Sequence, residues 1–86
     1  MINLVYAPIF VRLLKKLEAA LREEVIEKLK LLKNPANHKI LKVHKLHGQM
    51  EDRWSFSVNY KTRVVFRYIS KNEIAILSVG DHKIYE

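Results

Sequence analysis

Hydrophobic and polar residues alternate along the segment from Arg53 to Tyr68, and this pattern predicts a β-hairpin with its turn near Tyr60 to Thr62. Aromatic and β-branched side chains at every second position suit strands with one buried and one wet face. The expected buried set is Trp54, Phe56, Val58, Tyr60, Val64, Phe66 and Tyr68, and the opposite face holds Ser55, Ser57, Asn59, Lys61, Arg63, Val65 and Arg67. We expect any functional site on this polar, cationic face and at the edges of its sheet.

The N-terminal part of the chain has the periodicity of helices. A short apolar strand is expected over Ile2–Tyr6, and Pro8 fits the first turn of a helix, where its missing N–H has no partner in any case. A second helix is expected from about Ala19 to Lys33, and Asn34-Pro35 ends it. The two apolar stripes, expected to face each other and the sheet, are Ile9, Phe10, Leu13, Leu14 and Leu17, and then Leu21, Val25, Ile26, Leu29 and Leu32.

The rest of the chain predicts further strands. Leu41–Leu46 is expected to form a short strand, followed by a polar loop over Gly48–Asp52, and Ser70–Glu73 a tight turn. Ile74–Val79 is apolar without alternation, which is typical of a central strand covered on both faces. The order β-α-α-β-β-β predicts an α+β domain in which two helices pack on one face of a largely antiparallel sheet.

Length and composition limit the class of protein. The 86 residues form one expected domain, 1–86. The absence of cysteine excludes disulfides and thiolate metal sites. The first residues do not have the pattern of a signal peptide, and no apolar run approaches the roughly 20 residues that span a membrane. We therefore expect a soluble, cytoplasmic protein with no membrane association.

The charge distribution gives the first indication of function. The net charge is +7, which favours a polyanion or an acidic protein as partner. Between Lys28 and Met50 the chain has six lysines, three of its four histidines and no acidic residue. The acids of the N-terminal half lie before this basic window, at Glu18, Glu23, Glu24 and Glu27.

Three segments carry a resemblance to a known family. HKLHG at His44–Gly48, WSFSVNYKTRVVF at Trp54–Phe66 and VGDHKIY at Val79–Tyr85 together resemble the RelE-type toxins of bacterial toxin–antitoxin pairs, with histidines similar to the YafQ-like branch. The resemblance implies a RelE-like fold and a ribosome-dependent mRNA endonuclease that inhibits translation and is neutralised by a cognate antitoxin. The same superfamily includes ParE-like toxins that poison DNA gyrase, so fold alone does not fix the target.

The resemblance also implies roles for particular residues. Arg63 would contact the scissile phosphate, where a guanidinium offers two parallel donors. The implied catalytic set is His44, Arg63, His82 and Tyr85. The lysines that many RelE proteins carry on the aromatic strand are replaced here by Ser55 and Ser57. The additional His and Asp of the histidine-containing branch are also missing, since Ser57 and Lys61 stand near their places.

The chemistry of RNA cleavage suits these residue types. A base takes the proton of the 2′-OH, this oxygen attacks the adjacent phosphate, and an acid protonates the departing 5′-oxygen; histidine does either near neutral pH. Cationic side chains stabilise the phosphate, so no metal or other cofactor is expected. Zinc binding by His44 and His47 is disfavoured, because these two ligands have no Cys or nearby acid to complete a site. The expected RNA-binding residues are Lys45, His47, Lys61 and Arg67.

The sequence therefore predicts a metal-independent mRNA endonuclease toxin whose partners are the ribosome, mRNA and an acidic antitoxin. That antitoxin is expected to contact the helical pair Ile9–Lys33, a sheet edge, or both. Two alternatives remain, a ParE-like gyrase poison and a catalytically inactive, basic RNA-binding module. His44 and His82 favour the nuclease, because gyrase poisoning needs no acid–base pair.

Overall fold

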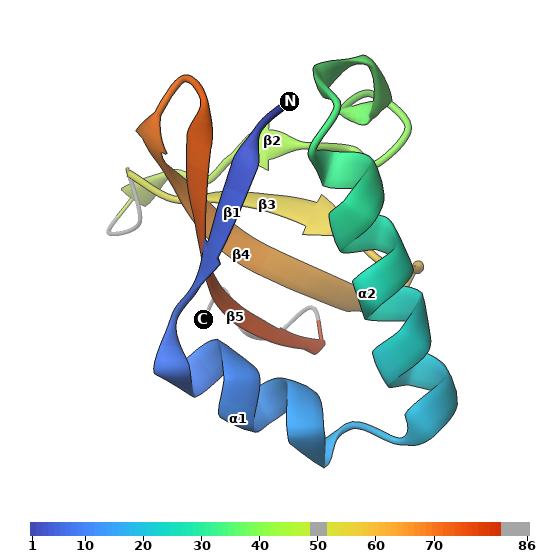
Figure 1. Ribbon diagram of the computed structural model, residues 1–86. Helices are drawn as coiled ribbons and strands as arrows, with labels where there is room; N and C mark the ends of the chain where they lie inside the picture. The colour runs from blue at the N-terminus through green and yellow to red at the C-terminus, as the bar shows by residue number, and fades with distance from the viewer. Residues whose placement is uncertain (49–51, 82–86) are drawn as a thin grey trace.

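The computed structural model describes residues 1–48 and 52–81, which form a five-stranded sheet and two main helices (Figure 1). Pro8 occupies the first turn of the first helix, as expected. In chain order the elements are β1 (Asn3–Tyr6), α1 (Pro8–Lys16), α2 (Ala19–Leu32), a 3₁₀ turn (Pro35–Asn37), β2 (His44–Lys45), β3 (Trp54–Ser57), β4 (Thr62–Ser70) and β5 (Glu73–Asp81). No helix in this described part of the chain is long and apolar enough to cross a membrane.

The sheet has the strand order β1-β5-β4-β3-β2. Strand β1 runs parallel to β5, and all other neighbours are antiparallel. The α+β class with two helices on a largely antiparallel sheet is therefore confirmed. Strand β5 is an interior strand between β1 and β4, and a bulge shifts its register so that Ile76 and Val79 both join the core. The bulge explains why this strand shows no simple alternation.

The corner between the helices is fixed by one side chain. Helix α1 ends at Lys16, and its last carbonyl groups need partners outside the helix. Arg22 of α2 supplies them, because its Nη2 donates to the Leu17 carbonyl at 2.8 Å and its Nε to the Leu14 carbonyl at 3.4 Å. A cation at a helix C-terminus also complements the helix dipole. The short connection and this contact hold α1 and α2 at the angle that Figure 1 shows.

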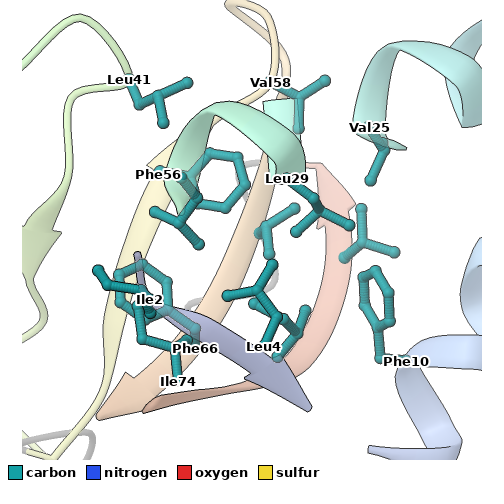
Figure 2. Close-up of a cluster of buried hydrophobic side chains, with 14 residues drawn as sticks. Ile2, Leu4, Phe10, Val25, Leu29, Leu41, Phe56, Val58, Phe66 and Ile74 are labelled. Atoms are coloured by element: carbon teal, nitrogen blue, oxygen red, sulfur yellow. The ribbon is translucent and has the colours of Figure 1, made fainter. Parts of the chain in front are cut away.

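The core lies between the helices and one face of the sheet. Figure 2 shows Phe10, Val25 and Leu29 of the helices in one buried cluster with Phe56 and Phe66 of the sheet. All five side chains are almost completely removed from water, and the two sheet phenylalanines contact each other with ring centroids 6.2 Å apart. Replacing such a phenylalanine with alanine typically lowers the free energy of unfolding by about 3–5 kcal/mol. That loss is a large part of the total stability of a small domain. This packing makes the helix-facing side a rigid base for the other face.

Several burial predictions for the hairpin are wrong. Tyr60 was expected in the core but is 92% exposed, because β3 ends at Ser57 and alternation no longer applies in the turn. Ser55 and Val65 were expected on a wet face, but they are 0% and 1% exposed. Both lie on interior strands of the sheet, where they stand opposite each other in the β3–β4 register. The face opposite the helices is therefore polar at its margin and closed at its centre.

The helix stripes and the predicted strand over Leu41–Leu46 also need correction. Ile9 and Ile26 are exposed, at 52% and 38%, since neither points at the sheet. Only His44–Lys45 forms a strand. Leu41 reaches the core from a turn instead, and its carbonyl accepts from the Ser57 N–H at 2.8 Å.

Candidate functional site

The register of the sheet places His44, Ser55, Ser57 and Arg63 on the face opposite the helices. His44 of β2 is paired with Ser55 of β3, and Ser57 of β3 is paired with Arg63 of β4. Paired residues share a face, and residues two apart on one strand return to it. His44 and Arg63 therefore lie on one face, separated by β3. Two of the four predicted catalytic residues therefore share one face of the sheet.

The imidazole of His44 is held at both nitrogens. Its Nδ1 lies 2.9 Å from the Lys42 carbonyl, which can only accept a hydrogen bond, so Nδ1 carries the proton. In the neutral ring, Nε2 is then the acceptor, and it lies 3.4 Å from the Ser55 hydroxyl. Lys42 adopts φ 58°, an uncommon value for a residue with a side chain, and such strain tends to gather at functional sites. His44 thus presents a basic nitrogen on an exposed strand.

Arg63 is half-buried and partly engaged by the backbone. Its Nη1 donates to the carbonyl of Asn59 at 2.7 Å and to that of Thr62 at 3.2 Å. The other guanidinium nitrogens form no hydrogen bond to the described residues. The side chain lines a half-open cleft of about 450 Å³ at the tip of the hairpin. Because only Nη1 of Arg63 is bonded to the backbone, the N–H groups of its other two guanidinium nitrogens can donate hydrogen bonds to an anion.

The predicted RNA-binding residues do not form one cluster. Lys45 is paired with Trp54 of β3, so its side chain leaves the sheet on the side opposite to His44. Arg67 is exposed on β4 beyond the bulge, and Lys61 is exposed in the hairpin turn. His47 is exposed after β2. Of these four residues, only Lys61 is adjacent in sequence to a residue that lines the same cleft as Arg63, namely Tyr60.

Two predicted catalytic residues, His82 and Tyr85, lie outside the described residues. The described chain ends at Asp81, which pairs with Thr62, the residue before Arg63. Within residues 1–48 and 52–81, no group of three His, Asp or Glu side chains is arranged to hold a metal ion. Burial raises the pKa of Tyr68, but this ring packs edge-on against Trp54 on the core side of the sheet.

Sequence reasoning missed two features of this face. Ser55 was treated as a missing lysine, whereas its hydroxyl contacts His44. Asn59 was treated as one polar residue among others, but its side-chain oxygen accepts from the N–H groups of Lys61 and Thr62, both at 2.8 Å. Its amide also donates to Glu24 of α2 at 3.1 Å. The segment Asn59-Tyr60-Lys61 could have indicated this turn in the sequence, since an Asn side chain commonly accepts from the backbone two residues further on.

Comparisons with known proteins find relatives by structure. No protein-family model matches the chain, and neither does any curated protein sequence. Among solved structures, a YoeB/ParE toxin from Agrobacterium tumefaciens is similar, with a TM-score of 0.75 and 19% identity over 94% of this chain and 99% of that one. An archaeal RelE in complex with RelB from Pyrococcus horikoshii has a TM-score of 0.73 and 19% identity, covering 95% and 96% of the two chains.

YafQ from Escherichia coli, which bears on the predicted YafQ-like branch, is also similar in structure. Its TM-score is 0.70 at 10% identity, covering 98% of this chain and 97% of that one. This likeness is no stronger than the others, so assignment to that branch stays a prediction. Each of the three similarities covers nearly the full length of this chain and of the compared chain. The chain has the fold shared by the RelE-, YoeB- and YafQ-type toxins.

Proposed function

We propose that this protein is the toxin of a type II toxin–antitoxin pair and that it cleaves mRNA on the ribosome. The observation that carries the proposal is the placement of His44 and Arg63 on one face of a RelE-type sheet. RNA cleavage needs a base, an acid and a cation at the phosphate; the His44 imidazole can serve as one of the first two, and the Arg63 guanidinium has donors left for the phosphate. The chain would act in the cytoplasm, where translated messages lie.

In the proposed reaction, the 2′-oxygen of one nucleotide attacks the adjacent phosphorus. The bond from phosphorus to the 5′-oxygen breaks, and the product ends in a cyclic 2′,3′-phosphate. One histidine of the pair His44 and His82 takes the proton of the 2′-OH, and the other returns a proton to the 5′-oxygen. Arg63 stabilises the phosphate as its charge rises, and Tyr85 stacks on a base or takes part in proton transfer.

The partner that we propose is an acidic antitoxin that occupies the helical pair. An apolar groove of about 260 Å³ runs between α1 and α2. It is lined by Tyr6, Phe10, Val11, Leu14, Ile26 and Leu29, with Lys30 and Lys33 at its rim. An amphipathic segment that carries acidic residues beside its apolar face matches this lining. Opposite charge would also speed the encounter, at a rate that falls as salt rises.

Induction of the chain in bacteria, followed by primer-extension mapping of transcripts, tests the proposal. The expected result is new 5′-ends inside translated regions, which disappear when translation initiation is blocked. Intact messages accompanied by DNA breaks and an SOS response would replace the nuclease with the gyrase poison. Normal growth at high expression would contradict both. Co-purification with the products of neighbouring open reading frames tests the antitoxin separately.

A further inference from the structure

The cleft at the tip of the β3–β4 hairpin joins three cations from distant parts of the chain. Lys28 comes from α2, Lys42 from the turn before β2, and Arg63 from β4. None of the described residues that line this cleft is acidic. Glu24 lies nearby, where it accepts a hydrogen bond from Asn59. Three convergent cations favour an anion, and the arginine keeps donors for it.

The lips of the same cleft are apolar and aromatic. Tyr60 is 92% exposed and Ile40 is 78% exposed, and Leu31 of α2 contributes a further exposed apolar side chain. The ring of Tyr60 stands on a fixed backbone, because the Asn59 side chain closes the turn and Arg63 donates to the Asn59 carbonyl. An exposed aromatic ring on a rigid turn can stack on a flat ligand with little loss of entropy.

We propose that this hairpin-tip cleft binds one nucleotide of a single-stranded RNA. The phosphate lies against Arg63, Lys28 and Lys42, and the base stacks on Tyr60. A cationic groove with an aromatic platform is the usual composition of a single-strand binding site. The volume of about 450 Å³ falls within the ordinary range of ligand sites. The inference rests on the proposed function and extends it, because it places a substrate contact on α2 and on the hairpin turn.

The test measures binding of the purified full chain to a fluorescent single-stranded oligonucleotide in which every 2′-OH is methylated. Such a strand cannot be cleaved, so binding is separated from transcript cleavage, and either proposal can fail alone. Tyr60→Ala should weaken binding at least about fivefold, whereas Tyr60→Phe keeps the ring and should stay within about twofold. Lys28→Gln should lower the slope of log K against log salt by about 0.7, the value for one phosphate contact on a single strand.

Lys16→Gln is the matched control, because it removes the same charge from an exposed site at the end of α1. It should leave the slope unchanged. All three substituted positions are at least partly exposed and outside the apolar core, and unchanged thermal midpoints of the four variants verify the fold. Equal effects of Lys16→Gln and Lys28→Gln, or no effect of Tyr60→Ala, would overturn the proposal. A glutamate-rich peptide with the same charge as the oligonucleotide provides a further test. If it binds as tightly as the oligonucleotide and shifts the amide signals of Ile40 and Asn59, the proposal is also overturned, because the cleft would then be a binding site for protein.

Discussion

Helix α2 separates two hollows of opposite chemistry. On one side lies the apolar groove shared with α1, to which α2 contributes Ile26, Leu29 and Lys30, followed by Lys33 at its C-cap. On the other side lies the hairpin-tip cleft, to which the same helix contributes Lys28 and Leu31. Residues three and four apart share a helical face, so the first set forms one stripe and the second set forms its neighbour.

The difference between the two hollows lies in what surrounds the helix. Opposite the groove, α1 presents Phe10, Val11 and Leu14, which offer only apolar surface. Opposite the cleft, the turns present Lys42, Tyr60 and Arg63, which offer charge and an exposed ring. One helix thus has one surface suited to a protein segment and another suited to a nucleic-acid strand. The comparison predicts that mutations on the two sides separate antitoxin binding from RNA chemistry.

The largest expected effect is on the face that carries the proposed catalytic residues His44 and Arg63. His44→Ala and Arg63→Ala should each lower transcript cleavage by about 10²–10⁴-fold, because each removes an acid–base or phosphate-binding group. The readouts are growth arrest and primer extension at equal expression. Lys16→Ala, a charge removed from α1 on the far side of α2, should retain full activity. Full toxicity of both site variants would show that the site lies elsewhere.

A charge in the apolar groove should disrupt the proposed antitoxin interface and leave the cleft intact. Ile26→Asp is expected to weaken antitoxin binding by about 2 kcal/mol, or roughly 30-fold in Kd, since a carboxylate would be desolvated against an acidic partner. Ile26 is exposed, so the fold should tolerate the change. Ile40→Asp adds the same charge at the cleft, and calorimetry should find its antitoxin affinity unchanged. Equal losses of antitoxin affinity in the two variants would contradict the proposal that the groove and the cleft bind different partners.

The hairpin turn should be stabilised by Asn59. Asn59→Ala removes two hydrogen bonds within the turn and one to Glu24, and is expected to cost about 1–2 kcal/mol of unfolding free energy. Asn3→Ala is the matched control, because its single exposed bond to Glu73 is worth little. Urea denaturation of both variants measures the difference. An Asn59→Ala protein as stable as wild type would mean that the tip is held by other contacts.

The smallest effect concerns Tyr68, which lines neither hollow. Burial raises the pKa of its phenol above the ordinary value of 10.0. Below pH 10 the phenol is neutral in both the folded and the unfolded state, so the contribution of Tyr68 to the free energy of unfolding is fully present. Above pH 10 the unfolded chain loses the proton first, and stability falls until the folded-state pKa is passed. Tyr68→Phe should flatten this alkaline loss slightly in thermal melts between pH 9 and about 11, and a steeper loss would reverse the assigned sign.

Patterning accounts for much of the fold. The alternation of Trp54 and Phe56 and the helical spacing of Phe10, Val25 and Leu29 predicted elements that the structure contains. The same patterning failed at Tyr60, because alternation holds only while the chain remains extended. It also failed at Ser55, because burial of the outer face of a strand depends on the assembled fold and not on the residue's place in the alternation.

From the sequence alone followed the α+β class with two helices ahead of the hairpin and the basic window, and the family resemblance of its motifs supplied the candidate residues His44 and Arg63. The expected order β-α-α-β-β-β is one strand short of the four that follow α2. The contacts of His44 with the Lys42 carbonyl and Ser55, and the opposite direction of Lys45, follow from the strand register and could not be read from the sequence. Only the tertiary structure joined Lys28, Lys42 and Arg63 around one cleft. The physical reason is that periodicity reports which face of its own element a side chain takes. Register and packing, which depend on contacts between distant segments, decide which faces meet.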